Sequence, residues 1–145
     1  MSEATTPAPA PARTPWHLWL VGALALLWNG FGALDFTATT SRFAPYTSQF
    51  PQETLDQVYA MPAWLLTVWG VSVWSAFIGA ILLLMRQRAA IWALALGLIT
   101  VCVLFIVALV DPQPGGDPAF MGLIVAIEAA LTAYAWWLAG RGVLR

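Results

Sequence analysis

The sequence contains no lysine, one histidine (His17) and one cysteine (Cys102). Six arginines and seven acidic residues leave a net charge of -1, which excludes the broad basic surface that nucleic-acid-binding proteins need. A single cysteine excludes an internal disulfide framework. One histidine is too few for a haem held by two histidines, and one histidine with one cysteine is too few for a zinc site. We therefore expect no metal, no cofactor and no nucleic-acid partner.

Charged residues of any kind are scarce, at 9% of the chain against about 25% in soluble domains. Four long apolar stretches each approach the roughly 20 residues that cross about 30 Å of hydrocarbon. They cover residues 16–35, 63–85, 89–110 and 119–139. Segments such as Val101–Val107 are apolar all round, which argues against a soluble bundle with polar outer faces. The sequence predicts an all-α integral membrane protein, a bundle of four transmembrane helices.

Residues 1–15 are rich in proline, alanine and threonine and have no apolar period. Such a segment cannot repay the entropy of ordering, so we expect a disordered cytoplasmic tail ahead of a transmembrane domain at residues 16–145. A cleaved signal peptide is not indicated, because Glu3 lies near the start and the apolar run that follows is too long.

Five of the six arginines fall on one side of the four spans, and only Arg42 falls on the other. The five are Arg13, Arg86, Arg88, Arg141 and Arg145. The positive-inside rule then places both termini in the cytoplasm of a multi-pass protein of the bacterial inner membrane. The bilayer is the first partner that the sequence indicates.

The connection between the first two spans is long, and loops of this length are more often functional than filler. Within it Pro51 and early acids precede apolar residues at helical spacing, which predicts a short amphipathic helix across the outer mouth of the bundle, stopped by Pro62. These apolar residues are Leu55, Val58 and Tyr59. By contrast, we expect the proline- and glycine-rich connection at residues 111–118 to be a rigid structural turn.

One face of the first span carries only small or polar residues, while leucines and Phe31 occupy the opposite face. The small face comprises Gly22, Ala25, Asn29, Gly32 and Ala33. Hydrocarbon offers no water to an amide, so Asn29 should face protein or a wetted cavity. Weaker stripes of small residues on the other spans favour close helix packing.

Glu128 lies near the middle of the fourth span, where a carboxylate costs about 2.5 to 3.5 kcal/mol on the permissive insertion scale. We expect its carboxyl to be largely protonated at neutral pH unless water or a cation reaches it, with Asn29 as its partner. Two interpretations stay open. Glu128 either handles protons or substrate, or makes an interhelical hydrogen bond that fixes the packing.

Asp35 closes the first span, either as a solvated interfacial carboxylate or, with Arg42, as an ion pair or polar rim for a ligand. Trp28, Trp69 and Trp74 lie deeper than an interfacial belt requires. They are either packing residues or an aromatic lining for a flat or sugar-like ligand.

A family resemblance rests on two long strings and three shorter features of the sequence. The long strings are LLWNGFGALDF at residues 26–36 and FPQETLDQVYAMPAW at residues 50–64, and the shorter features are Trp74, LLLMR at residues 82–86 and the closing RGVLR. They resemble a family of small four-span proteobacterial membrane proteins. That family has no established activity, and its members are often labelled sugar transporters. Asn29, Asp35, Pro62 and Trp64 match the family pattern, whereas an acid at Glu128 departs from it.

No motif for nucleotide binding, zinc hydrolysis or a serine nucleophile occurs, so we expect a non-enzymatic protein. The leading hypothesis is that it binds or passes a small sugar-like or amphipathic solute through a site beneath the outer loop. Asn29 and Asp35 would supply polar contacts, and Trp28, Tyr59 and Trp64 the apolar walls. Transport would require a homo-oligomer. The alternative is an accessory or assembly subunit of a larger membrane complex. An enzyme acting on lipids or quinones has only Glu128 in its favour.

Overall fold

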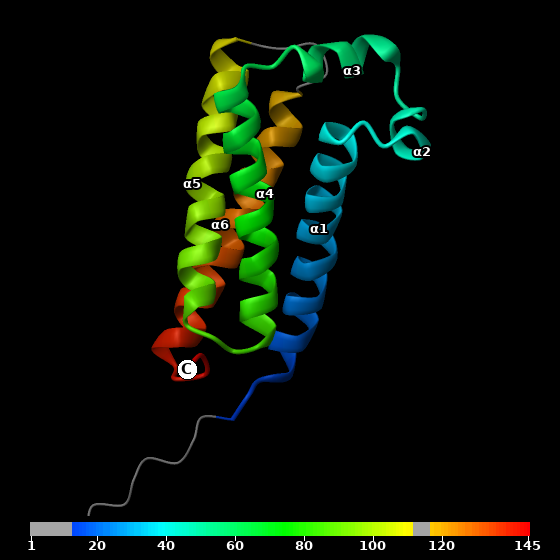
Figure 1. Ribbon diagram of the computed structural model, residues 1–145. Helices are drawn as coiled ribbons and strands as arrows, with labels where there is room; N and C mark the ends of the chain where they lie inside the picture. The colour runs from blue at the N-terminus through cyan, green and yellow to red at the C-terminus, as the bar shows by residue number, and fades with distance from the viewer. Residues whose placement is uncertain (1–12, 112–116) are drawn as a thin grey trace, which may run out of the picture.

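The computed structural model describes residues 13–111 and 117–145, and within these ranges all regular structure is helical. Four helices are long and apolar enough to cross a membrane, so the predicted all-α, four-span architecture is confirmed. They are α1 (Trp16–Thr40), α4 (Ala63–Leu84), α5 (Ala89–Val110) and α6 (Pro118–Gly140). Figure 1 shows them side by side in a bundle, with α2 (Ala44–Thr47) and α3 (Gln52–Tyr59) beyond one end. Residues 1–12 of the expected tail and 112–116 of the expected rigid turn lie outside the described residues.

The two ends of the bundle differ in charge. We call one the arginine end, because it carries Arg86, Arg88, Arg141 and Arg145, and the other the aspartate end, because it carries Asp35, Asp111 and Asp117. Helix α1 begins at the arginine end, and the C-terminus lies at the same end (Figure 1). Exposed tryptophans occur at both ends, as is typical of membrane interfaces. Trp16, Trp19, Trp92 and Trp136 lie at the arginine end, and Trp64 at the aspartate end.

The small face of α1 packs inward, against α4 in particular. Gly22, Ala25 and Ala33 are buried, and Asn29 is only 6% exposed. The large residues of the opposite face are exposed, with Leu27 at 72% and Phe31 at 66%. The inward orientation that the amide of Asn29 required is therefore confirmed, and the leucine face is left for lipid.

The α4–α5 pair has the most extensive packing in the bundle, and two glycines allow it. A Cβ atom at Gly79 would lie 2.7 Å from Cγ and 3.0 Å from the backbone nitrogen of Leu94. Gly97 is similarly close to Ala76, and the Ser72 hydroxyl donates to the Gly97 carbonyl over 3.3 Å. The small-residue stripes of these two helices therefore bring their backbones together.

Helix ends depart from the sequence prediction where local hydrogen bonds extend or start a turn. Helix α1 runs on to Thr40, five residues past its predicted end. The hydroxyls of Thr37 and Thr40 donate to the carbonyls four residues earlier. Helix α6 begins one residue early, because Pro118 occupies its first turn and the Asp117 carboxylate accepts from the Ala119 N–H over 2.9 Å.

The long connection contains two short helices where the sequence predicted one. Helix α3 lies within the predicted stretch and follows Pro51, whereas α2 was not predicted. Pro62 does not end α3, which already stops at Tyr59; it precedes the first residue of α4 instead.

Residues 141–145 fold back under the bundle and complete its core at the arginine end, which nothing in the sequence pattern predicted. Val143 and Leu144 are 5% and 1% exposed. The Arg145 N–H donates to the Arg86 carbonyl over 2.7 Å, and the Arg88 N–H donates to the Arg145 carbonyl over 2.9 Å. The same core contains Leu18, Leu83, Leu94 and Leu138, one from each long helix. Packing is therefore dense at this end.

Candidate functional site

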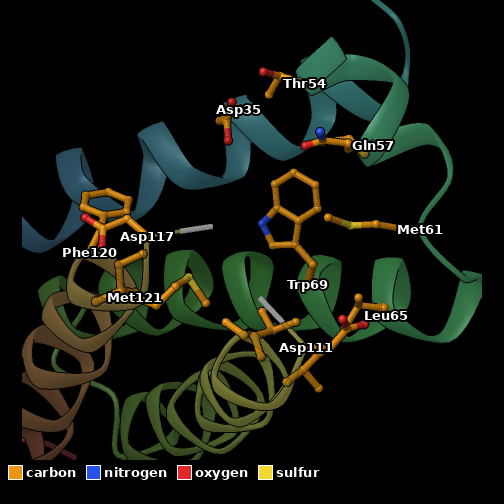
Figure 2. Close-up of a pocket in the computed structure, with 15 residues that line it drawn as sticks. Asp35, Thr54, Gln57, Met61, Leu65, Trp69, Asp111, Asp117, Phe120 and Met121 are labelled. Carbon is orange, nitrogen blue, oxygen red and sulfur yellow. The ribbon is translucent and has the colours of Figure 1, made fainter. Parts of the chain in front are cut away.

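The aspartate end is hollow, in contrast to the arginine end. A cavity of about 330 Å³ lies there, with walls from all four long helices and a roof from α3 (Figure 2). Thr54, Gln57 and Val58 stand at positions i, i+3 and i+4 of α3, so one face of this short helix covers the cavity. The amphipathic pattern that predicted α3 thus also places its inner face over the mouth of the bundle.

Asp35 is the polar group at the α1 side of the cavity. The Tyr46 hydroxyl of α2 donates to its Oδ1 over 2.6 Å. Burial of Tyr46, its hydrogen bond to Asp35 and the negative charge of that carboxylate raise the pKa of Tyr46 to about 12. Tyr46 therefore stays a donor at neutral pH and holds the Asp35 carboxylate in place. Oδ2 of Asp35 makes no hydrogen bond within the described part of the chain, so it is available to a ligand.

Trp69 of α4 forms the central aromatic surface of the cavity, next to Met61 and across from Asp35 in Figure 2. The Phe36 ring packs edge-on against Trp69, with ring centroids 4.9 Å apart. A Cβ atom at residue 70 would lie 2.7 Å from Cζ of Phe36, so Gly70 makes room for that ring. The Phe36 ring thus supports the indole of Trp69 and fixes the surface that the indole presents to the cavity.

The far side of the cavity is formed by the adjoining ends of α5 and α6. Asp111 follows α5, and Asp117 caps the N-terminus of α6. Phe120 and Met121 follow on the first turn of α6 and line the same space. None of the side chains that line the cavity is basic. Among the described residues, no three His, Cys, Asp or Glu side chains converge as metal ligands would.

Arg42 contacts α3, the helix that covers the cavity, but does not itself line the cavity. It adopts a left-handed backbone conformation, with φ of 55°, where the chain turns away from α1. Its guanidinium carbon lies 4.3 Å from the centre of the Tyr59 ring at the end of α3. Leu55, 8% exposed, anchors the middle of the same helix. Asp35 is hydrogen-bonded to Tyr46, and Arg42 is stacked on Tyr59, so the structure does not show the ion pair between them that the sequence left open.

Glu128 and Asn29 lie below the cavity, in the middle of the bundle. Counted from the arginine end of each helix, they stand at roughly 18 and 20 Å, at the same depth, and their side chains are within interaction range. The Asn29 amide nevertheless donates to the Ala25 carbonyl of its own helix over 3.1 Å. Glu128 is 2% exposed, and its Oε2 has no hydrogen-bond partner among the described residues. The structure brings the two together as expected, but leaves this one oxygen of the carboxyl without a partner among the described residues.

Of the binding residues chosen from the sequence, only Asp35 lines the cavity. Trp28 and Trp64 lie on the outer surface, at 37% and 55% exposure, Tyr59 stacks under Arg42, and Asn29 lies deeper. The sequence reasoning did not single out Gln57 or Phe120. It did select Trp69 as a tryptophan that lies deep in its span. The inward orientation of Trp69 can be recognised from its helical spacing, since Leu65, Trp69 and the buried Ser72 stand at positions i, i+4 and i+7 on one face of the helix.

No family model matches this chain, and no curated protein or solved structure matches it either. The resemblance of residues 26–36 and 50–64 to the four-span proteobacterial family therefore stays an expectation from the sequence. The function has to be argued from the cavity itself.

Proposed function

We propose that this chain is a non-enzymatic, multi-pass protein of the bacterial inner membrane that binds a small amphipathic solute in the aspartate-end cavity. In this proposal the arginine end faces the cytoplasm, as the positive-inside rule favours, and the cavity opens on the outer side. The supporting observation is a hollow of about 330 Å³ with apolar walls and a few polar groups at its mouth. Small-molecule sites have this form and this size.

Preorganisation supports a binding role for these side chains. The Asp35 carboxylate is held by Tyr46, and the Trp69 ring is held by Phe36. Neither group has to be ordered when a ligand arrives, which lowers the entropic cost of binding. The Asp35 carboxylate would orient a polar or charged group of the solute, and the Trp69 ring would contact its apolar body.

The alternative, an accessory subunit of a larger membrane complex, is supported by a different surface. An open groove of about 420 Å³ runs between α1 and α4, and Gly30, Leu34, Trp74 and Phe77 are among the residues that line it. A partner helix would fit a groove bordered by a small residue and aromatic rings. Gentle detergent extraction separates the two proposals: foreign chains in stoichiometric amount favour the subunit, and this chain alone favours the solute-binding protein.

The test of solute binding fills the cavity. Ala108 lines it from α5, so Ala108→Phe should remove much of its volume. The matched control is Ala133→Phe, since Ala133 is exposed on α6 away from the cavity. In lipid nanodiscs, a panel of sugars, amphipathic alcohols and amines is screened for stabilisation against heat. A ligand at ten times its Kd stabilises by about 1.4 kcal/mol.

We expect at least one compound class to raise the unfolding temperature of the native protein and of Ala133→Phe, but not of Ala108→Phe. A shift that survives in Ala108→Phe would place the ligand elsewhere and refute the cavity as the site. Asn29→Ala tests the sequence-based choice separately, since loss of ligand binding in that variant would extend the site down to the amide.

A further inference from the structure

The charged side chains that line the cavity, among the described residues, all have the same sign. Asp35, Asp111 and Asp117 line it, and no lining side chain is basic. The nearby Arg42 is stacked on Tyr59 and is not among the lining residues. A cation entering this partly apolar space is attracted by unit charges in a medium less polar than water, whereas an anion is repelled by the same charges.

The apolar part of the lining suits a soft, positively charged group. The rings of Trp69 and Phe120 and the thioethers of Met61 and Met121 face the same space (Figure 2). An aromatic face attracts ammonium groups through its quadrupole, most strongly for tryptophan, and this attraction increases when the site excludes water. The two methionines add polarizable, adaptable surface around it.

A second and independent observation comes from below the cavity floor. Met121 and Ile124 of α6 line the cavity, and Glu128 stands at i+7 and i+4 from them on the same helix face. The Cα–Cβ bond of a helical residue tilts toward the helix N-terminus, so Glu128 leans toward the cavity from roughly 6 Å below Ile124. Its carboxyl is 2% exposed and Oε2 has no partner among the described residues. One oxygen of this buried carboxyl, Oε2, therefore lies without a partner beneath a cavity that is already bordered by aspartates.

Other ligand chemistries fit less well. A sugar needs many donors and acceptors at its hydroxyls, but among the described residues Thr54 and Gln57 are the only uncharged polar side chains, apart from the indole N–H, that line this space. A bare metal ion needs carboxylates that converge on one point, and the described residues contain no such cluster. A positive charge spread over an apolar molecule would interact favourably with both the carboxylates and the aromatic rings.

We infer that the solute of this cavity is an organic monocation, an aryl or alkyl quaternary or protonated amine, held between Asp35 and the Trp69 ring. This inference rests on the proposed function, because it names the chemical class of the solute bound at that same site. Asp111 and Asp117 attract the cation to the mouth of the cavity, and the unpartnered Oε2 of Glu128 provides a further polar atom beneath its floor.

The experiment compares three probes of similar size and different charge: benzyltrimethylammonium, neutral N,N-dimethylbenzamide and anionic phenylmethanesulfonate. The full chain is placed in nanodiscs of zwitterionic phosphatidylcholine, so that the lipid itself does not attract the cation. Saturation-transfer NMR titrations measure the Kd of each probe. Asp35→Asn keeps an oxygen acceptor for Tyr46 and removes one charge. Asp56→Asn removes the same charge from an exposed residue of α3 that does not line the cavity.

We expect the cation to bind at least tenfold more tightly than either of the other probes, and its affinity to decrease with added salt. Asp35→Asn should weaken cation binding roughly tenfold, as expected for the loss of one unit charge at contact distance in a partly wet site. Asp56→Asn should change it less than twofold.

Two results would overturn the inference. Equal binding of the neutral and cationic probes, unchanged by Asp35→Asn but lost in Ala108→Phe, would refute the cation and leave the cavity as a site for neutral solutes. Absence of binding by all three probes refutes the cation as well. The proposed function fails with it only if the wider panel also gives no stabilisation that Ala108→Phe removes.

Discussion

The tightest helix contact in the bundle makes a quantitative prediction about Gly79. In Gly79→Ala the new methyl group would stand 2.7 Å from Cγ of Leu94, 2.8 Å from its Cδ2 and 3.0 Å from its backbone nitrogen. Leu94 is completely buried, so its side chain has no free space to move into. The backbone contact cannot be relieved by any change of rotamer. Helices α4 and α5 must therefore separate by several tenths of an ångström along a well-packed interface.

Two effects act in opposite directions on the stability of this variant. Overpacking of a core by one methyl group costs about 1 to 3 kcal/mol. Replacing a helical glycine by alanine gains about 1 kcal/mol of intrinsic helix stability. Gly122→Ala is the matched control, because it makes the same chemical change in α6, where the nearest atoms would lie 3.8 Å away, in ordinary contact. The helix propensity cancels in the difference, which should equal the steric cost alone.

The assay is equilibrium unfolding in mixed micelles with increasing SDS fraction, followed by circular dichroism. Gly79→Ala should be about 1 to 3 kcal/mol less stable than Gly122→Ala. Adding Leu94→Ala to Gly79→Ala should recover part of the loss, giving a coupling energy between the two sites. Stabilities of Gly79→Ala and Gly122→Ala that agree within about 0.5 kcal/mol would show that the α4–α5 approach is not as close as described.

Further variants test the arginine end and the roof of the cavity. Leu144→Ala removes a side chain that is 1% exposed and should cost about 2 to 5 kcal/mol in the same assay. The exposed Leu123→Ala should cost far less, and equal losses would contradict the folded-back position of residues 141–145. Tyr46→Phe removes the hydrogen bond to Asp35 and should lower the thermal unfolding temperature at pH 8. The pKa of folded Tyr46 is about 12 against an ordinary 10.0, so its contribution is complete below pH 10 and lost as the pH rises toward 12. The difference between native protein and Tyr46→Phe should therefore shrink by pH 11, and a difference that grows with pH would reverse the sign of this argument.

The sequence was sufficient for the architecture because hydrocarbon penalises each misplaced polar group. One amide at Asn29 was enough to orient α1, since a buried and a lipid-facing amide differ by several kcal/mol. Helix ends were less accurate, because they depend on hydrogen bonds such as those of Thr37 and Asp117, which shift a boundary by a turn or by one residue.

The cavity was harder to predict because it depends on the relative heights and rotations of several helices. Trp64 matched a motif and lay near the mouth, but successive helical residues are about 100° apart, and Leu65 takes the inward position. The same geometry turns Trp28 outward beside the buried Asn29. Tyr59 contacts Arg42, a pairing that depends on how the whole connection folds.

The folded-back residues 141–145 have a consequence for how a solute travels. Because Leu144 packs among the leucines of four helices, the arginine end of the bundle is closed below the cavity. Under the proposed function, a solute would therefore enter and leave at the aspartate end. Carriage across the bilayer would require this plug to be withdrawn, breaking its two backbone hydrogen bonds to the Arg86–Arg88 turn. Under the same proposal, the folded chain would act as a receptor rather than as a channel, and whatever displaces residues 141–145 would control passage of the solute.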